Sequence, residues 1–208
     1  MPIRTIYEKI PKEEIEQMPK VFFPGKIYII ETQDEVQNAV SFLKQFSILG
    51  LDTETRPSFK KGEKHKVSLL QLSTLEECFL FRLNLIDLPL CVIQLLSNPD
   101  ILKVGLSLHD DISALKRRKE FTPSAFFDLQ EYVKKFDIED LSLQKIYANI
   151  FHSRISKRQR LTNWEAENLT ESQKQYAAID AWACIRLYKE LKEIERGNNY
   201  HHIINGTE

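Results

Sequence analysis

The segment at residues 47–55, SILGLDTET, constrains the fold more than any other part of the sequence. It begins as a continuous apolar run, which is typical of a strand that is covered on both faces inside a sheet. It ends in two acidic side chains, Asp52 and Glu54. Residues i and i+2 of a strand share a face, so these carboxylates point the same way, and Leu51 and Thr53 point the other way. The segment therefore predicts a central strand that ends at a site.

Other segments with strand-like or helical patterns lie on both sides of this strand along the chain. We expect strands at residues 26–31, 67–73, 78–83, 101–104 and 125–128, and helices at residues 33–45, 90–96, 108–118, 129–135, 142–150 and 171–196. The strands first form an antiparallel meander and then alternate with helices. This order predicts an α/β fold in which helices flank a mixed central sheet.

The length and composition fit one globular domain with short appendages. The chain has 208 residues, of which 42% are hydrophobic and 28% are charged, and both values are ordinary for a folded domain. We expect an irregular, proline-containing N-terminal arm at residues 1–25 with a short helix near Lys12–Gln17. The main domain is expected at residues 26–196, and a polar C-terminal tail at residues 197–208.

Charge, hydropathy and cysteine content exclude several classes of protein. The formal net charge of −1 argues against an architectural nucleic-acid coat with a large basic field, although an enzyme can hold nucleic acid through a local basic patch. No apolar run reaches the ~20 residues of a membrane span, and the N-terminus has no secretory h-region. The cysteines, of which there are 3, suit neither a disulfide framework nor a thiolate zinc site. We expect an intracellular protein, cytoplasmic if bacterial, without membrane contact.

The acidic pair Asp52 and Glu54 needs a positive partner. Neighbouring carboxylates repel each other and raise each other's pKa, and no Lys or Arg occupies a matching position on the strand. A divalent cation such as Mg²⁺ or Mn²⁺, which prefers oxygen ligands, would offset the repulsion. The alternative, which is the commoner meaning of an isolated aspartate-x-glutamate, is two solvated acids at the mouth of a loop.

The last helix carries a second unusual carboxylate. Thr170 and Gln173 form a capping-box pattern that fixes the start of this helix. Tyr176 and Asp180, one turn apart, then lie on its apolar face, where an ionised carboxylate is costly unless it is paired. Both side chains can therefore reach one site. Alternatively, Tyr176 packs in the core and Asp180 forms a salt bridge with a neighbour.

A third carboxylate comes from the helix expected at residues 108–118. Leu108 and Leu115 belong to its buried face. Asp111 lies on this face, whereas Asp110 is about 200° round the helix from Leu108 and points to water. Asp111 is therefore the better candidate for a site, unless both aspartates serve only as acids at the positive end of the helix.

Taken together, these segments resemble the DEDD superfamily of 3′→5′ exonucleases. The likeness is to the subgroup with a tyrosine in its third motif (DEDDy type), which includes the Werner-helicase exonuclease domain and ribonuclease D. The three motifs match, in order, Asp52 with Glu54, Asp111 within VGLSLHDD, and Tyr176 with Asp180. The likeness extends over residues 25–195, which is nearly the whole chain.

The resemblance implies a ribonuclease-H-like fold and a site for two divalent metal ions, Mg²⁺ or Mn²⁺. Asp52 would bridge both ions, Glu54 and Asp180 would lie at the ion on the side of the nucleophile, and Asp111 would hold the second site largely through water. Tyr176 would position the attacking water, since a phenol is a poor base at neutral pH. The resemblance thus implies an enzyme, a phosphodiester hydrolase, that releases nucleoside 5′-monophosphates from the 3′ end of DNA or RNA.

Basic residues near the second and third motifs could bind the phosphates of nucleic acid. The candidate nucleic-acid contacts are Arg154, Lys157, Arg158 and Arg160. The basic run at residues 116–119 is a further candidate, and the alternative for each run is a solvated surface. Trp164 could stack on a base, although packing in the core is the simpler explanation.

We therefore expect a stand-alone 3′→5′ exonuclease that acts on nucleic acid as a monomer, without an obligate protein partner. One alternative is a catalytically silent nucleic-acid-binding domain of the same fold, against which the presence of all the motif acids and the tyrosine counts. Another is an interaction module that works through the arm at residues 1–24 and does not need the acids. DNA and RNA both remain open as substrates, because recognition of a 2′-hydroxyl is a local contact.

Overall fold

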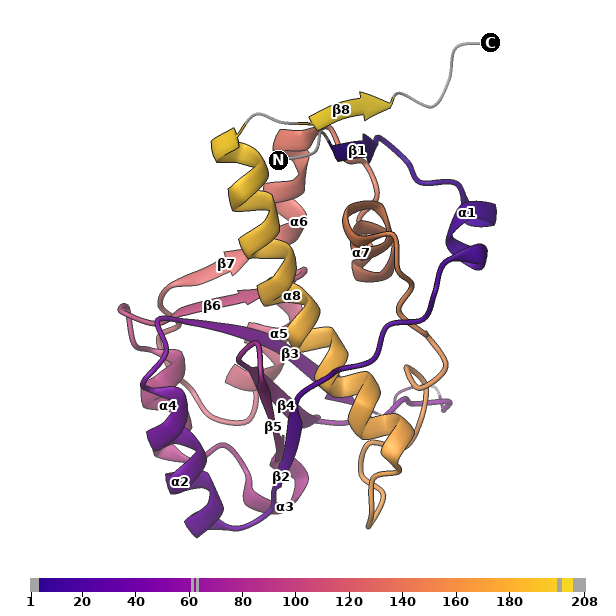
Figure 1. Ribbon diagram of the computed structural model, residues 1–208. Coiled ribbons are helices and arrows are strands. Elements are labelled where there is room, and N and C mark those ends of the chain that lie inside the picture. Colours follow the sequence, from indigo (N-terminus) through magenta and orange to yellow (C-terminus); the bar gives the residue numbers. More distant parts are fainter. Residues whose placement is uncertain (1–3, 61, 63, 198–199, 204–208) are drawn as a thin grey trace.

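The computed structural model describes residues 4–60, 62, 64–197 and 200–203. Its centre is a 6-stranded mixed sheet (Figure 1). The strands, in spatial order, are β2 (Lys26–Ile30), β5 (Glu77–Arg82), β4 (Val67–Ser73), β3 (Ile48–Thr55), β6 (Leu102–Gly105) and β7 (Phe126–Asp128). Because β3 is antiparallel to β4 and parallel to β6, it lies inside the sheet, as its apolar run predicts.

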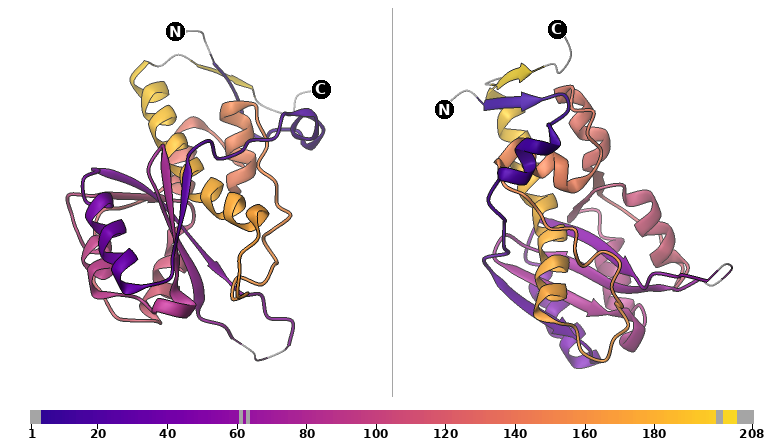
Figure 2. Two further views of the ribbon diagram at one scale, coloured as in Figure 1. Left: turned by 60° about the horizontal axis from the view of Figure 1, so that its bottom comes forward. Right: turned by 90° about the vertical axis from the view of Figure 1, so that its right-hand side faces the viewer.

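Helices cover both faces of the sheet and divide the core in two (Figures 1 and 2). On one face, α8 (Glu171–Gly197) runs across β3. The helices on the other face are α2 (Gln33–Leu43), α4 (Leu90–Leu96) and α5 (Leu108–Lys116). Leu49 and Leu51 of β3 belong to this second core, which leaves Gly50 and Asp52 facing α8. The predicted fold class, a mixed sheet flanked by helices, is confirmed.

Shorter helical elements complete the domain. They are α3 (Leu83–Ile86), α6 (Leu129–Tyr132), a 3₁₀ helix (Val133–Phe136) and α7 (Leu143–Phe151). The sequence does not predict α3, because a single turn is too short for a periodic pattern. The continuous helix expected at residues 129–135 is wrong in detail, since its second half is the 3₁₀ turn. Every helix in the described part of the chain is too short or too polar to span a bilayer.

The two terminal segments lie side by side. β1 (Arg4–Tyr7) pairs in parallel with β8 (Tyr200–Ile203), which the sequence does not predict, because the pairing joins residues from opposite ends of the chain. The arm also contains α1 (Lys12–Gln17), as predicted. It then runs beside α8, where the backbone N–H of Phe23 donates to Oε1 of Gln175 at 3.1 Å. Of the predicted arm and tail, residues 1–3, 198–199 and 204–208 lie outside the described part of the chain.

A buried arginine anchors the loop that precedes α8. Arg82, at the end of β5, is 1% exposed and pairs with the carboxylate of Glu31 at 2.9 Å. Its guanidinium also donates to the backbone carbonyls of Ala166 and Glu167, at 2.5 and 3.2 Å. The same loop carries Trp164, whose side chain is fully buried. These contacts fix the start of α8, and hence the position of the residues that follow on this helix.

Candidate active site

Three carboxylates meet where β3 ends beneath α8. Asp52 and Glu54 come from β3 and Asp180 comes from α8, and each offers an oxygen atom that lies within 4.8 Å of the other two. Glu54 and Asp180 are buried, and Asp52 is half-buried. The structure therefore brings together the acids of the first and third sequence motifs.

A close approach between β3 and α8 makes this meeting possible. A Cβ atom added at Gly50 would lie 2.0 Å from the backbone oxygen of Ala181, so the helix backbone rests directly on the strand. Gly50 is two residues before Asp52 on the same face, and Ala181 follows Asp180. A side chain at residue 50 would lift the helix and separate the two aspartates. The sequence does not predict this requirement, because it depends on a contact between distant segments.

The fourth acid, Asp111, comes from α5 at the edge of this group. Its carboxylate accepts a hydrogen bond from the hydroxyl of Thr53, the residue between Asp52 and Glu54. The charge of Asp111 raises the pKa of both of these acids, so all the motif carboxylates share one electrostatic environment. Asp110 is different, because its side chain is 92% exposed, as its place on the helix predicts.

A carboxylate that the sequence motifs do not include, Asp128, stabilises the start of α5. Ser107, just before the helix, has a positive φ of 58°. The backbone N–H groups of Ser107 and Leu108 donate to the carboxylate of Asp128, at 2.9 and 2.8 Å. Asp128 ends β7, the strand beside β6, and so fixes the turn that presents Asp111. The sequence signal that could identify Asp128 is the same as for Asp52, namely an acidic residue at the end of a predicted strand.

Burial and mutual repulsion favour the protonated form of these acids. In each case burial is the largest cause: it raises the pKa of Asp52 well above its usual range, of Glu54 to about 9, of Asp180 to about 7 and of Asp111 to about 6. Repulsion from neighbouring acids adds to the rise for Asp52 and Glu54, and the guanidinium of Arg160 lowers the pKa of Glu54. Without a further positive charge, the cluster therefore keeps protons at neutral pH.

Tyr176 lies one turn before Asp180, and its ring centre is 6.1 Å from that of Trp164. Burial, followed by the charges of Asp180 and Glu54, raises the pKa of the phenol above its ordinary value. A hydrogen bond from this hydroxyl lowers the pKa of Asp180. Tyr176 therefore keeps its proton and acts as a donor. Trp164 packs in the core, which is the simpler of the two explanations that its sequence position allows.

The chemistry of the acidic group suits a hard divalent cation. Its donor set consists of carboxylate oxygens, which Mg²⁺ and Mn²⁺ prefer. One of these atoms, Oδ1 of Asp180, is buried and has no hydrogen-bond partner among the described residues. A buried acceptor without a partner needs an explanation, and a cation would supply it. The residues present therefore fit the cations that the sequence motifs predict.

The domain matches a known protein family over most of its length. The sequence profile of the 3'-5' exonuclease domain matches residues 27–195. The chain belongs to this family. It is 30% identical over 186 residues to the mouse bifunctional 3'-5' exonuclease/ATP-dependent helicase WRN, a match that covers 85% of this chain and 13% of that protein. The chain thus spans only a small part of this relative's length.

Two solved structures are also similar to this exonuclease domain. The exonuclease domain of Nibbler from Aedes aegypti matches with a TM-score of 0.75 and 21% identity, over 84% of this chain and 90% of that one. Ribonuclease D from Trypanosoma brucei, in complex with RNA U12, matches with a TM-score of 0.69 and 19% identity, over 81% of this chain and 63% of that one. These likenesses confirm the ribonuclease-H-like fold.

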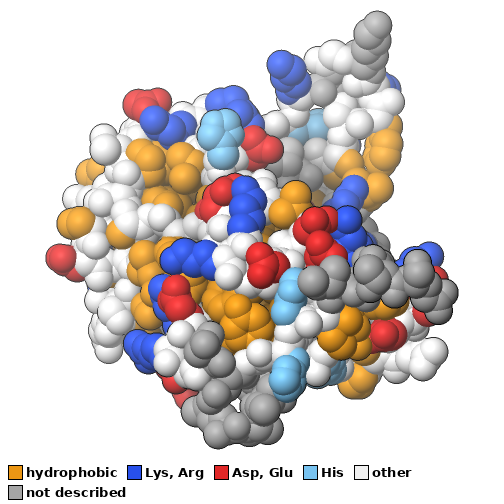
Figure 3. Space-filling view, turned by 90° about the horizontal axis from the view of Figure 1, so that it is seen from above, with side chains coloured by type: hydrophobic (Ala, Val, Ile, Leu, Met, Phe, Trp, Pro, Cys, Tyr) orange, Lys and Arg blue, Asp and Glu red, His pale blue; other side chains and the backbone are white. Residues whose placement is uncertain are grey.

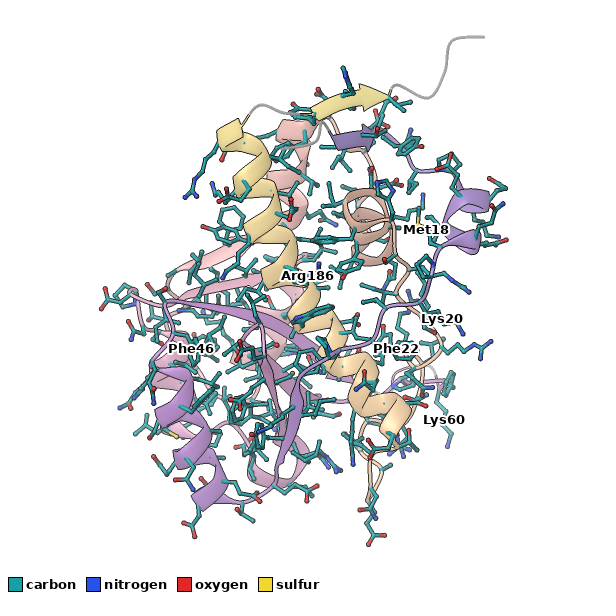
Figure 4. All side chains as sticks on the ribbon, viewed as in Figure 1. Met18, Lys20, Phe22, Phe46, Lys60 and Arg186 are labelled. Atoms are coloured by element: carbon teal, nitrogen blue, oxygen red, sulfur yellow. The ribbon has the colours of Figure 1, made fainter. Side chains whose placement is uncertain are left out.

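The four basic residues predicted to contact nucleic acid differ from one another in their surroundings. The side chain of Arg154 is bound to the arm, because its Nε donates to the backbone oxygen of Met18 at 2.9 Å. The basic residues of this stretch that are exposed to solvent are Lys157, Arg158 and Arg160. A cavity beside α8 has walls formed by Arg158, Tyr176 and two arm residues, Lys20 and Phe22, and Figure 4 shows both arm residues beside the helix.

Two side chains of the second basic run, residues 116–119, form contacts within the domain. Arg118 pairs with the carboxylate of Asp87 at 2.9 Å and donates to the backbone oxygen of Val67 at 2.6 Å, and Lys116 pairs with Glu120 at 2.9 Å. Figure 3, a view onto the end of the molecule that carries β1 and β8, shows basic and acidic side chains interspersed. The ion pairs of Lys116 and Arg118 do not favour these two side chains as phosphate contacts.

Proposed function

We propose that this exonuclease domain is a catalytically active, two-metal-dependent 3′→5′ exonuclease of the DEDDy type, which releases nucleoside 5′-monophosphates from DNA or RNA. The observation that carries the proposal is the convergence of Asp52, Glu54 and Asp180, whose oxygens lie within 4.8 Å of one another, with Asp111 and Tyr176 beside them. Buried carboxylates at this spacing are costly as ions unless positive charge offsets them. The metal cations of a nuclease site would supply this positive charge.

Each acid has a role that follows from its position. Asp52, Glu54 and Asp180 would hold the cations, and Asp111, at the edge of the group, would complete the second site. Bound cations of this kind polarise an attacking water and offset the charge on the leaving 3′ oxygen. Because the pKa values of the acids are raised, loading of the site would release protons from them.

Tyr176 would orient the attacking water. Its pKa is raised by burial and by the neighbouring carboxylates, so the phenol would donate a hydrogen bond and would not remove a proton. Trp164 packs against it and restricts its movement. Substitution of Tyr176 by Phe would therefore lower the rate of hydrolysis and leave cation binding largely unchanged.

A nucleic acid with a free 3′ end is the proposed substrate. The mouse relative is named a 3'-5' exonuclease, and the similar ribonuclease D from Trypanosoma brucei is described in complex with RNA U12. The exposed side chains of Lys157, Arg158 and Arg160 would contact backbone phosphates and make affinity dependent on salt. This local basic stretch is compatible with a net charge of −1.

Incubation with 5′-labelled single strands of DNA and RNA of matched sequence tests the proposal. In Mg²⁺ or Mn²⁺ we expect a ladder that shortens from the 3′ end and disappears with EDTA. The variants Asp52→Ala and Asp180→Ala should abolish it, and an undiminished ladder from either variant contradicts the proposal. Binding of the strands without shortening would instead favour a catalytically silent domain.

A further inference from the structure

A second buried polar side chain near the acidic group has no partner. Gln71, on β4, is 0% exposed. Neither its Oε1 nor its Nε2 has a hydrogen-bond partner among the described residues. An amide in this state destabilises the folded protein, whereas an apolar side chain of the same shape would not. Its presence therefore calls for an explanation other than the packing of the core.

The pairing of the strands places Gln71 beside the metal-binding acids. Gln71 lies directly opposite Asp52 in the antiparallel β3–β4 pair. Residues opposed in this way project on the same face, with their Cβ atoms about 4.5–5.5 Å apart. Leu69, two residues earlier on β4, belongs to the core beneath α8, which confirms that this face of β4 is turned to the helix. Gln71 thus lies between Asp52 on one side and Leu80 of β5 on the other.

The same place contains a second atom without a partner, the buried Oδ1 of Asp180. Asp180 and Asp52 offer oxygens within 4.8 Å of each other, so this acceptor belongs to the group that Gln71 borders. The amide of Gln71 offers donors, and the carboxylates offer acceptors. The amide and the carboxylates are therefore complementary in their hydrogen-bonding chemistry.

The neutral charge of the amide matters at this position. A Lys or Arg beside Asp52 would form an ion pair and would compete with a divalent cation for the carboxylate oxygens. An amide donates hydrogen bonds to carboxylates without adding positive charge. It can thus hold the ligands in place and leave their charge available to the cation.

We infer that Gln71 is a positioning residue of the metal site, whose side-chain amide donates to the Asp52 and Asp180 carboxylates when they hold a cation. The inference rests on the proposed function, since it assigns Gln71 to the cation site of that nuclease. Outer-sphere partners of this type orient metal ligands, and their loss typically weakens metal affinity or activity by about 10–100-fold.

The substitution Gln71→Met tests this role, because methionine has nearly the same shape and no donor. We expect the Tm of the metal-free protein, measured in EDTA, to rise by about 2–4 °C as the unpaired amide is removed. We expect the Kd for Mn²⁺, measured by calorimetry or by electron paramagnetic resonance of free Mn²⁺, to increase about 10-fold or more. These opposite changes distinguish a positioning role from a structural one.

Ser142→Ala is a matched control. Ser142, just before α7, also has a buried side-chain oxygen without a partner among the described residues, and it belongs to none of the elements that carry the acids. This variant should bind Mn²⁺ as the wild type does. The inference is overturned if Gln71→Met binds Mn²⁺ with wild-type affinity. It is also overturned if Gln71→Met has a lower metal-free Tm than the wild type or fails to fold.

The wild-type protein separates this inference from the proposed function. If it binds Mn²⁺ but does not shorten a labelled strand, the proposed activity is wrong, and the ratio of Mn²⁺ affinities between wild type and Gln71→Met still decides the role of Gln71. If it binds no Mn²⁺ at millimolar concentration, both are overturned.

Discussion

The hydroxyl of Thr53 donates a hydrogen bond to the carboxylate of Asp111. β3 therefore presents Asp52 and Glu54 on one face, and through the residue between them it also holds the acid of α5. The bond lowers the pKa of Asp111 and so works against the effect of burial, which is the larger influence. One strand thus organises the acids of the first and second motifs.

Substitution of Thr53 by Val keeps the shape of the side chain but removes this donor. Asp111 would lose the contact that favours its ionised form, and we expect activity at limiting Mg²⁺ to fall by about 10–100-fold, the range typical of outer-sphere partners of metal ligands. Thr53→Ser, which retains a hydroxyl, should stay close to the wild type. Steady-state rates over a Mg²⁺ titration measure the effect, and equal rates for the Val and Ser variants would contradict it.

Gly50→Ala tests the close approach between β3 and α8. The added Cβ would overlap the backbone oxygen of Ala181, and we expect the free energy of unfolding to fall by about 1–3 kcal/mol, as for other overpacked sites. Mn²⁺ affinity should fall as well, because Asp180 moves away from Asp52. Urea unfolding and a Mn²⁺ titration measure these changes.

Gly62→Ala provides the comparison for Gly50→Ala, because a Cβ at that loop position meets nothing within 4 Å. Its positive φ of 88° makes alanine unfavourable there, by about 1–2 kcal/mol, but Mn²⁺ affinity should not change. A Gly50→Ala protein with wild-type Mn²⁺ affinity would show that the helix need not rest on the strand.

The raised pKa values of the acids predict how the metal-free protein responds to pH. A carboxyl group with a raised pKa in the folded state contributes most stability below its ordinary pKa of about 4. That contribution is lost as the pH rises through about 6 for Asp111, about 7 for Asp180 and about 9 for Glu54. In EDTA, the Tm should therefore fall between pH 5 and pH 9.

Asp180→Asn isolates the acidic cluster from the other groups that titrate over this range. The variant cannot ionise at this position, so its Tm should fall less steeply with pH and should exceed that of the wild type at pH 8. Thermal unfolding followed by circular dichroism measures both slopes. Parallel curves for the two proteins would show that the cluster does not control the pH dependence.

The adjacent aspartates of α5 should behave differently. Asp111→Asn removes an acid of the cluster, and we expect a loss of roughly 100-fold or more in activity, beyond the effect of an outer-sphere change. Asp110→Asn alters a side chain that is 92% exposed, and we expect a change of about 2-fold or less, as is usual for surface positions. A larger loss of activity in Asp110→Asn than in Asp111→Asn would show that Asp111 is the wrong choice for the site.

Local geometry explains how much of the site the sequence predicts. The alternation of a strand puts Asp52 and Glu54 on one face, and the period of a helix separates Asp111 from Asp110. Both rules need only neighbouring residues, and the structure agrees with both. The apolar face of the last helix likewise places Asp180 in the interior.

The features that the sequence does not predict depend on contacts between distant segments. β1 and β8, which pair with each other, come from opposite ends of the chain. The buried guanidinium of Arg82 binds a loop more than 80 residues away in sequence, at Ala166 and Glu167. The Nε of Arg154, a predicted nucleic-acid contact, donates to the backbone oxygen of Met18 in the arm. Neither propensity nor motif spacing contains this information.

The elevated pKa values of the buried acids make hydrogen ions and divalent cations competing ligands for the same oxygen atoms. Each unit decrease in pH would then raise the cation concentration needed for half-occupancy, with no rearrangement of the fold. Mild acidification would in this way weaken cation binding reversibly, and the heat of Mn²⁺ binding would vary with the ionisation enthalpy of the buffer. A plot of the binding heat against the ionisation enthalpy of the buffer would have a slope equal to the number of hydrogen ions released for each cation bound.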